Sequence, residues 1–162
     1  LKPFSVRKDV KYIPTDKEIE DVLSLCTLSQ MRLLLFVRDT YCRINEALNL
    51  TYNDIGKDFV VIYTNKSKNG DRVHRKVSLP DCLKGIKNPT DKTERVFKDW
   101  TETPRFLEKK VKQLEQDTWS WHNLRHRGAS LMSKKVIPLY DIMRKLGHQH
   151  LETTQKYLQE LS

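Results

Sequence analysis

Residues 122–157 read HNLRHRGASLMSKKVIPLYDIMRKLGHQHLETTQKY, and the side chains of this stretch suggest a chemical site. It contains His122, Arg125, His148 and Tyr157. A guanidinium group can hold two phosphate oxygens, imidazoles can move protons, and a phenol can attack phosphorus. Together they predict a site that cleaves a phosphodiester without a metal ion or other cofactor. Taken singly, a buried histidine or tyrosine is more often a packing residue.

Three short motifs within this stretch have a telling order and spacing. They read HNLRH at 122–126, LGH at 146–148 and TTQKY at 153–157, and Tyr157 lies nine positions after His148. The motifs resemble the H-x-L-R-H, L-G-H and T-T-x-x-Y boxes of the tyrosine recombinases, the phage-type integrase family. This resemblance covers nearly the whole chain and is carried by several motifs rather than one.

An upstream segment, DTYCRINEALNL at residues 39–50, resembles the family's T-G-x-R-x-x-E-x-x-x-L box. Arg43 then matches the first catalytic arginine, and Glu46 matches the acidic residue three positions later. Tyr41 stands where the family commonly has glycine, so the local turn departs from the family pattern. Arg43 is expected to be half-buried and to need an anionic partner, which could be Glu46, Asp54 or a DNA phosphate.

The resemblance implies a role for each of these side chains. Arg43 and Arg125 would clamp the scissile phosphate, because guanidinium groups stay charged and match phosphate geometry. Tyr157 would attack and become a covalent 3′-phosphotyrosine, with His122 as the candidate base and His148 bonded to a phosphate oxygen. A 5′ hydroxyl from another strand would then reverse the step, so no ATP is needed.

A predicted β-hairpin supplies the remaining candidate residue. Residues 59–63 and 73–79 alternate as strands do, and Asn69-Gly70 between them is a hairpin-turn signal. Lys68 lies where the family carries its catalytic hairpin lysine, which would protonate the leaving 5′ oxygen. Lys66 remains an alternative, and turn lysines are commonly only solvated.

The predicted fold class is α+β, mostly helical with a small antiparallel sheet made of this hairpin and a short strand near Val96. Residues 1–14 are expected to be a linker or arm and residues 15–162 the recombinase catalytic domain, with the family's N-terminal DNA-binding domain absent from this chain. Capping signals and periodicity predict helices after the T-x-x-E box at 15–18, across 30–37, from about 103 to 114, from 122 to about 134, and from Pro138.

Composition excludes several other classes. The chain has 162 residues, enough for one domain with a core, and a net charge of +9, which fits either a face for a polyanion or a merely basic protein. Cys26, Cys42 and Cys82 are widely spaced, which indicates neither a disulfide framework nor a zinc ribbon and fits a reducing compartment. The longest apolar run, at 33–37, is too short to span a membrane, and the start of the chain lacks a signal-peptide core.

The leading interpretation is a site-specific DNA recombinase, the integrase of a mobile element or prophage, acting on double-stranded DNA in the cytoplasm at the nucleoid. A free monomer that forms a tetramer on DNA is expected, with DNA-bending or directionality proteins as candidate accessory partners. The segment around Tyr157 is expected to be comparatively mobile until DNA and neighbouring protomers bind.

The alternatives are a Xer-like chromosome resolvase, a type IB topoisomerase, a catalytically inactive DNA-binding regulator and a metal-dependent nuclease. A zinc site would use His122, His126, His148 and His150. It is disfavoured because Arg125 would repel a cation and no carboxylate or cysteine is placed with the histidines.

Overall fold

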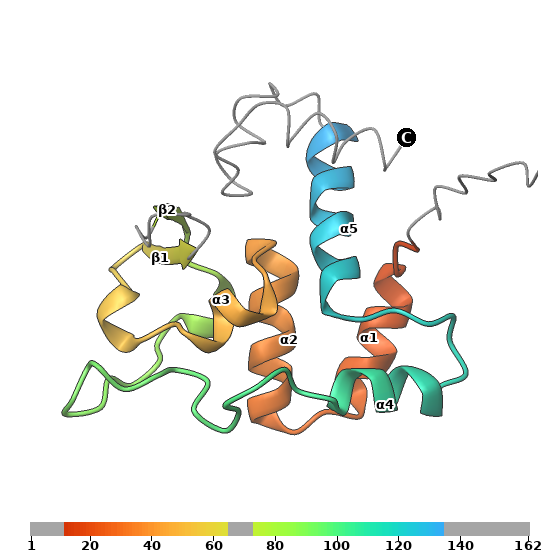
Figure 1. Cartoon of the computed structure of the whole chain (residues 1–162), viewed down its shortest axis with the longest axis horizontal. Coiled ribbons are helices and arrows are strands. Elements are labelled where there is room, and N and C mark those ends of the chain that lie inside the picture. The colour runs from red at the N-terminus through yellow and green to blue at the C-terminus, as the bar shows by residue number, and fades with distance from the viewer. Residues whose placement is uncertain (1–11, 65–72, 135–162) are drawn as a thin grey trace, which may run out of the picture.

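The computed structural model describes residues 12–64 and 73–134 (Figure 1). In this part of the chain the elements follow in the order α1 (Asp16–Ser24), α2 (Leu28–Thr40), α3 (Ile44–Leu48), η1 (Tyr52–Asp54), β1 (Phe59–Thr64), β2 (Val73–Ser78), η2 (Asp81–Leu83), α4 (Phe106–Gln113) and α5 (Trp121–Lys134). The predicted α+β class, mostly helical with a small antiparallel sheet, is confirmed. The helix predicted from Pro138 lies outside the described residues.

Helix α1 begins at the predicted capping box. The Thr15 hydroxyl accepts a hydrogen bond from the Glu18 amide at 3.1 Å, and the Glu18 carboxylate accepts one from the Thr15 amide at 2.9 Å. Helix α2 begins at a second box, between Thr27 and Gln30, that the sequence analysis did not use. Each reciprocal pair satisfies amides that a helix start would leave without partners.

Helix α2 runs through the core, as the apolar run predicted. Its buried side chains are Leu33, Leu34, Phe36, Val37 and Thr40. Helix α5 packs along α2 and extends past the hairpin (Figure 1). No helix in residues 12–64 or 73–134 is both long and apolar enough to cross a bilayer.

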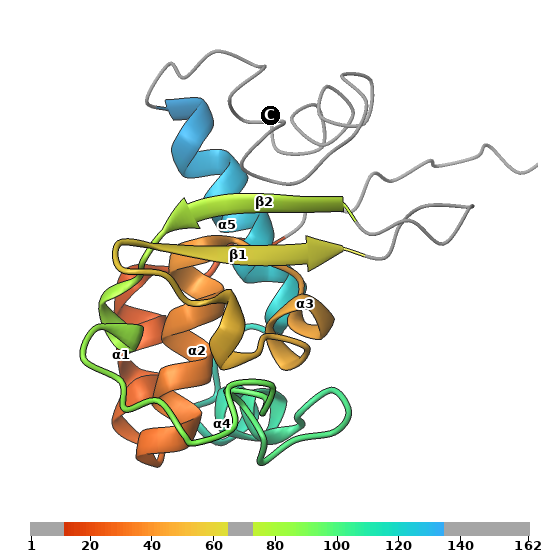
Figure 2. The ribbon, with the colours of Figure 1, turned by 90° about the vertical axis from the view of Figure 1, so that its left-hand side faces the viewer.

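The predicted hairpin is confirmed as two antiparallel strands, paired from Phe59 opposite Ser78 to Thr64 opposite Val73. Val60, Ile62 and Val77 point inward and are buried, as strand alternation requires. Figure 2 shows the hairpin in the upper part of the view, with the end of α5 rising above it and α4 at the bottom.

The predicted third strand near Val96 is wrong. Within the described ranges, this segment pairs through one bridge, Thr51 with Arg95, next to a hydrogen bond of 2.9 Å from the Val96 amide to the Leu50 carbonyl. The Arg95 guanidinium instead donates to the backbone carbonyls of Leu48 and Trp100, at 2.9 and 2.8 Å. The Arg95 side chain therefore connects this segment to its neighbours, whereas a third strand would have done so through backbone hydrogen bonds.

Candidate active site

A buried carboxylate, that of Glu46 on α3, gathers three guanidinium groups. Arg75 on β2 makes two hydrogen bonds to it, from Nη2 to Oε1 at 3.1 Å and from Nη1 to Oε2 at 3.3 Å. Nη1 of Arg43 lies 3.6 Å from Oε2, and Nη1 of Arg125 lies 4.0 Å from Oε1. The two predicted clamp arginines therefore approach one carboxylate from separate elements.

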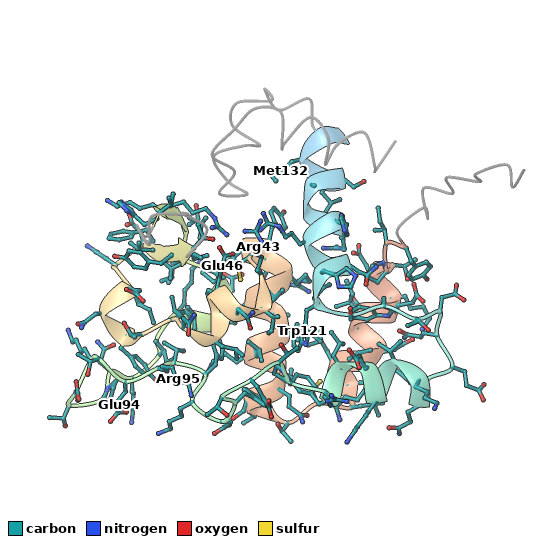
Figure 3. All side chains as sticks on the ribbon, viewed as in Figure 1. Arg43, Glu46, Glu94, Arg95, Trp121 and Met132 are labelled. Atoms are coloured by element: carbon teal, nitrogen blue, oxygen red, sulfur yellow. The ribbon has the colours of Figure 1, made fainter. Side chains whose placement is uncertain are left out.

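Arg43 occupies the N-cap position of α3, with extended backbone angles. Its amide donates to Glu46 Oε1 at 2.8 Å, which fixes the first turn of this short helix. The side chain is 31% exposed, and its Nη1 makes no hydrogen bond with any residue of the described ranges. Glu46 is thus the protein partner predicted for Arg43, whereas Asp54 bonds the amide and hydroxyl of Thr51. Figure 3 shows Arg43 and Glu46 close together at the hairpin end of the molecule.

Arg125 lies on the inward face of α5. Trp121, Leu124, Ala129 and Met132 on the same helix are buried, at the spacing of an amphipathic stripe. The Arg125 side chain is only 5% exposed, and its Nη1 donates to the Tyr41 carbonyl at 3.0 Å. An arginine in an apolar stripe requires polar partners, and the α2–α3 connection provides them.

Tyr41, at the position where the family commonly has glycine, adopts a backbone conformation that suits glycine. Its φ and ψ are 60° and 22°, the left-handed region, and it ends α2. That conformation is uncommon for a residue with a side chain. The Tyr41 ring lies over Gly128 of α5, where an added Cβ would come within 2.3 Å of the ring. Contact with α5 therefore fixes a turn whose carbonyl also holds Arg125.

Arg75 was missed by the sequence analysis, although a signal existed. Strand β2 alternates, and Arg75 falls on the inward side with Val73 and Val77, opposite Ile62. A charged residue at an inward position predicts a buried counter-charge. Glu46, already identified as the acidic residue of its motif, is that counter-charge.

The ionisation states follow from these contacts. Burial acts to raise the pKa of Glu46, but the hydrogen bonds and charge of Arg75, with the Arg43 amide and Arg125, lower it below its usual 4.5. Burial raises the pKa of the fully buried Cys42 thiol to about 11, so it stays neutral. Among the described residues, Glu46 and the arginines therefore set the local charge, and positive charge is in excess.

His122 lies one turn before His126 on α5. His122 is exposed, and its Nδ1 lies 3.1 Å from the Ser120 hydroxyl. His126 is buried, and the two rings meet edge-on with centroids 6.1 Å apart. The described ranges contain no group of three or more His, Cys, Asp or Glu side chains placed to hold a metal ion.

The structure thus brings Arg43 and Arg125 together and places His122 three residues before Arg125 on the same helix. Lys68, Lys66, His148 and Tyr157 lie outside the described residues, as do His150 and the whole segment expected to be mobile.

Comparisons with known proteins address the family and the fold of this chain. The model of the phage integrase family matches residues 15–162. The chain belongs to the phage integrase family. Within that family, the tyrosine recombinase XerA of Saccharolobus solfataricus is 30% identical over 161 residues, which cover 93% of this chain and 53% of that relative. The chain therefore spans about half the length of this relative.

Two solved structures share the fold of this integrase-family chain. The catalytic domain of bacteriophage HP1 integrase gives a TM-score of 0.69 at 20% identity, covering 91% of this chain and 87% of that one. The Tn1549 transposon integrase in complex with transposon right end DNA gives 0.68 at 15% identity, covering 97% and 62%. Both confirm the predicted recombinase catalytic-domain fold.

Proposed function

We propose that this protein is a site-specific recombinase that breaks and rejoins strands of double-stranded DNA through a covalent 3′-phosphotyrosine. The observation that carries the proposal is the approach of Arg43 and Arg125 to one carboxylate already held by Arg75. Three guanidinium groups around one carboxylate leave positive charge for an anion, and a phosphodiester matches their planar donors.

In the proposed reaction each side chain has one task. Arg43 and Arg125 bind the non-bridging oxygens and stabilise the charge that develops there. The Tyr157 hydroxyl loses its proton, with His122 as base, and its oxygen bonds to phosphorus while the bond to the 5′ oxygen breaks. Lys68 protonates that leaving oxygen, and His148 donates to the phosphate. A 5′ hydroxyl of a second strand then displaces the tyrosine, which reseals the DNA.

Two biological roles fit this chemistry. Integration of a mobile element or prophage is the role we favour, on the motifs of the sequence. Chromosome resolution is the second candidate, because the relative at 30% identity is a Xer-type recombinase. An inactive DNA-binding regulator is disfavoured, because the chain retains all six candidate catalytic residues. We propose that residues 15–162 form the catalytic domain, and that it assembles as a tetramer on DNA.

The test is the formation of a covalent protein–DNA adduct. A pool of nicked duplexes with randomised sequence is incubated with the protein, and adducts that survive denaturing electrophoresis are isolated and sequenced. The selected duplex then serves as the probe for variants. Wild type is expected to give the adduct without added metal or ATP, and Tyr157→Phe is expected to give none while still binding the probe.

Tyr140→Phe is the matched control, since it removes a hydroxyl from a tyrosine outside the motifs. It is expected to form the adduct at the wild-type rate. An adduct that persisted in Tyr157→Phe would assign the nucleophile to another residue. No adduct from wild type on any duplex of the pool would contradict the proposed function.

A further inference from the structure

Among the described residues, Arg75 makes the closest side-chain contacts to Glu46, and neither the motifs nor the family match gives it a role. Its fork meets both carboxylate oxygens, at 3.1 and 3.3 Å, and the two side chains are 7% and 5% exposed. A planar guanidinium bound to both oxygens of a carboxylate is a strong and well-oriented pair. The contact joins β2 to α3 across 29 positions of sequence.

We propose that Arg75 is a positioning residue for the phosphate clamp. It occupies the Glu46 carboxylate, which keeps the guanidinium group of Arg43 from closing on that carboxylate and leaves its N–H donors for the scissile phosphate. The inference rests on the function proposed above, because it presumes that Arg43 binds a phosphodiester together with Arg125.

The distances support the assignment of the Glu46 carboxylate to Arg75. A normal N–H to O hydrogen bond spans roughly 2.7–3.2 Å between heavy atoms. The contacts of Arg43 and Arg125 with Glu46, at 3.6 and 4.0 Å, are longer, whereas those of Arg75 are near this range. The carboxylate also accepts the Arg43 amide at 2.8 Å, so three donors already occupy its two oxygens.

Loss of Arg75 would change where the other arginines bind. A carboxylate in a buried site attracts any nearby cation more strongly than it would in water. Arg43 is the more exposed of the two remaining arginines, and its Nη1 has no hydrogen bond within the described ranges. We therefore expect Arg43 to turn onto Glu46 and to lose its place on the phosphate.

The same contact anchors the hairpin. Because Arg75 lies in β2 and bonds a residue of α3, it fixes the strand that leads away from the β1–β2 connection. That connection contains Lys68 in the sequence. Arg75 thus links the element that carries the proposed acid to the helix that presents Arg43.

The first experiment compares variants on the selected nicked duplex. Arg75→Met keeps most of the side-chain length without the charge, and it is expected to slow adduct formation per folded molecule by about 10²-fold, as misplacement of a binding group does. Arg75→Met combined with Glu46→Gln is expected to recover about 10-fold of that loss, because a neutral amide cannot trap Arg43, although its oxygen still accepts the Arg43 amide.

Arg75→Lys is the second variant, in case the methionine form does not fold. Lysine keeps the charge but meets the carboxylate as a point donor, so one oxygen is released. A loss of about 10-fold is expected, on the same reasoning about misplaced groups. Addition of Glu46→Gln should again reduce the loss.

Arg95→Met is the matched control. Arg95 is also partly buried and also makes two hydrogen bonds, but to backbone carbonyls away from Glu46 (Figure 3). It is expected to lower the Tm while leaving the rate per folded molecule unchanged. If Arg75→Met behaved in the same way, or if the double variant were no faster than Arg75→Met, the positioning role would be overturned.

A second measurement needs no DNA. Proton exchange at the Arg43 Nε–H group, followed by NMR, is expected to slow in Arg75→Met as Arg43 pairs with Glu46, and to return to the wild-type rate in the double variant. If wild type forms no adduct, the proposed function fails. The exchange rates of Arg43 still test whether Arg75 keeps Arg43 away from Glu46. Unchanged Arg43 exchange in Arg75→Met would overturn the inference even in an active recombinase.

Discussion

The two ends of the five-residue helix α3 both bind arginine, but in different ways. At the C-terminal end, Nη1 of Arg95 donates to the carbonyls of Leu48 and Trp100. At the N-terminal end, three guanidinium groups approach the Glu46 carboxylate, and among the described residues only Arg75 bonds it through its side chain. At the C-terminal end, Arg95 binds neutral carbonyls and so joins separate segments of the chain. The excess of cations over carboxylates at the other end favours binding of an external anion.

The largest effect is expected from Glu46→Ala, which removes the anion and leaves the excess charge uncompensated. Arg75 would remain buried without the carboxylate that it binds. Removal of one partner of a buried ion pair costs about 3–5 kcal/mol, and we expect a loss of unfolding free energy in that range. Urea denaturation measures it, and a loss below about 1 kcal/mol, as for an exposed pair, would show that the cluster contributes little.

The next largest effect is on catalysis. Arg43→Ala and Arg125→Ala are each expected to lower the rate of adduct formation by about 10²–10³-fold, as for removal of one preorganised donor. Lysine should substitute poorly at either position. Rates are measured on the selected nicked duplex and corrected for the folded fraction.

Arg127→Ala provides the control for Arg125, since it lies two residues away on α5. Its guanidinium pairs with Asp16 of α1 instead of Glu46. We expect the cleavage rate of this variant to stay near that of wild type. A comparable loss at both arginines would mean that helix packing, not a phosphate clamp, underlies the effect.

A smaller effect is expected where α5 contacts the end of α2. Gly128→Ala would push the Tyr41 ring, whose carbonyl holds Arg125, and overpacking of this kind costs about 1–3 kcal/mol. Tyr41→Gly in the same chain removes the ring and suits the positive φ, so the double variant should lose less stability than the sum of the single variants. Additive losses in thermal denaturation would mean that this contact does not couple the two helices.

The smallest expected effect is on how the stability of the protein depends on pH. The pKa of Glu46 is lowered in the folded protein, so the stability that its charge contributes is present above its unfolded pKa, near 4.5, and is lost as the pH falls through the folded pKa. The stability difference between wild type and Glu46→Gln should therefore narrow below pH 4.5. A constant difference throughout acid titration would show that the carboxylate is not bound as a charged group.

The sequence predicted features with local causes. The capping box of Thr15 and Glu18 requires residues three positions apart, and the hairpin requires alternation and a turn signal. The family motifs at residues 39–50 and 122–126 also predicted that Arg43 and Arg125 act together. The C-terminal half of the candidate site, with His148 and Tyr157, remains a prediction.

The features that the sequence analysis missed depend on distant partners. A third strand was predicted near Val96, but Arg95 makes its bonds to carbonyls of other segments. The left-handed turn at Tyr41 depends on a glycine 87 positions later, Gly128. Prediction of the contact of Arg75 would have required the strand register, which places Arg75 on the same side as its partner Glu46.

The most direct test of the phosphate clamp changes the charge of the substrate instead of the protein. A methylphosphonate at the scissile position of the selected duplex lacks the charged non-bridging oxygen that Arg43 and Arg125 are proposed to bind. Adduct formation by wild type and Arg125→Ala is compared on the phosphate and methylphosphonate duplexes. We predict that the deficit of about 10²–10³-fold on phosphate shrinks markedly on methylphosphonate. An equal deficit on both duplexes would contradict the claim that this arginine acts on the phosphate charge.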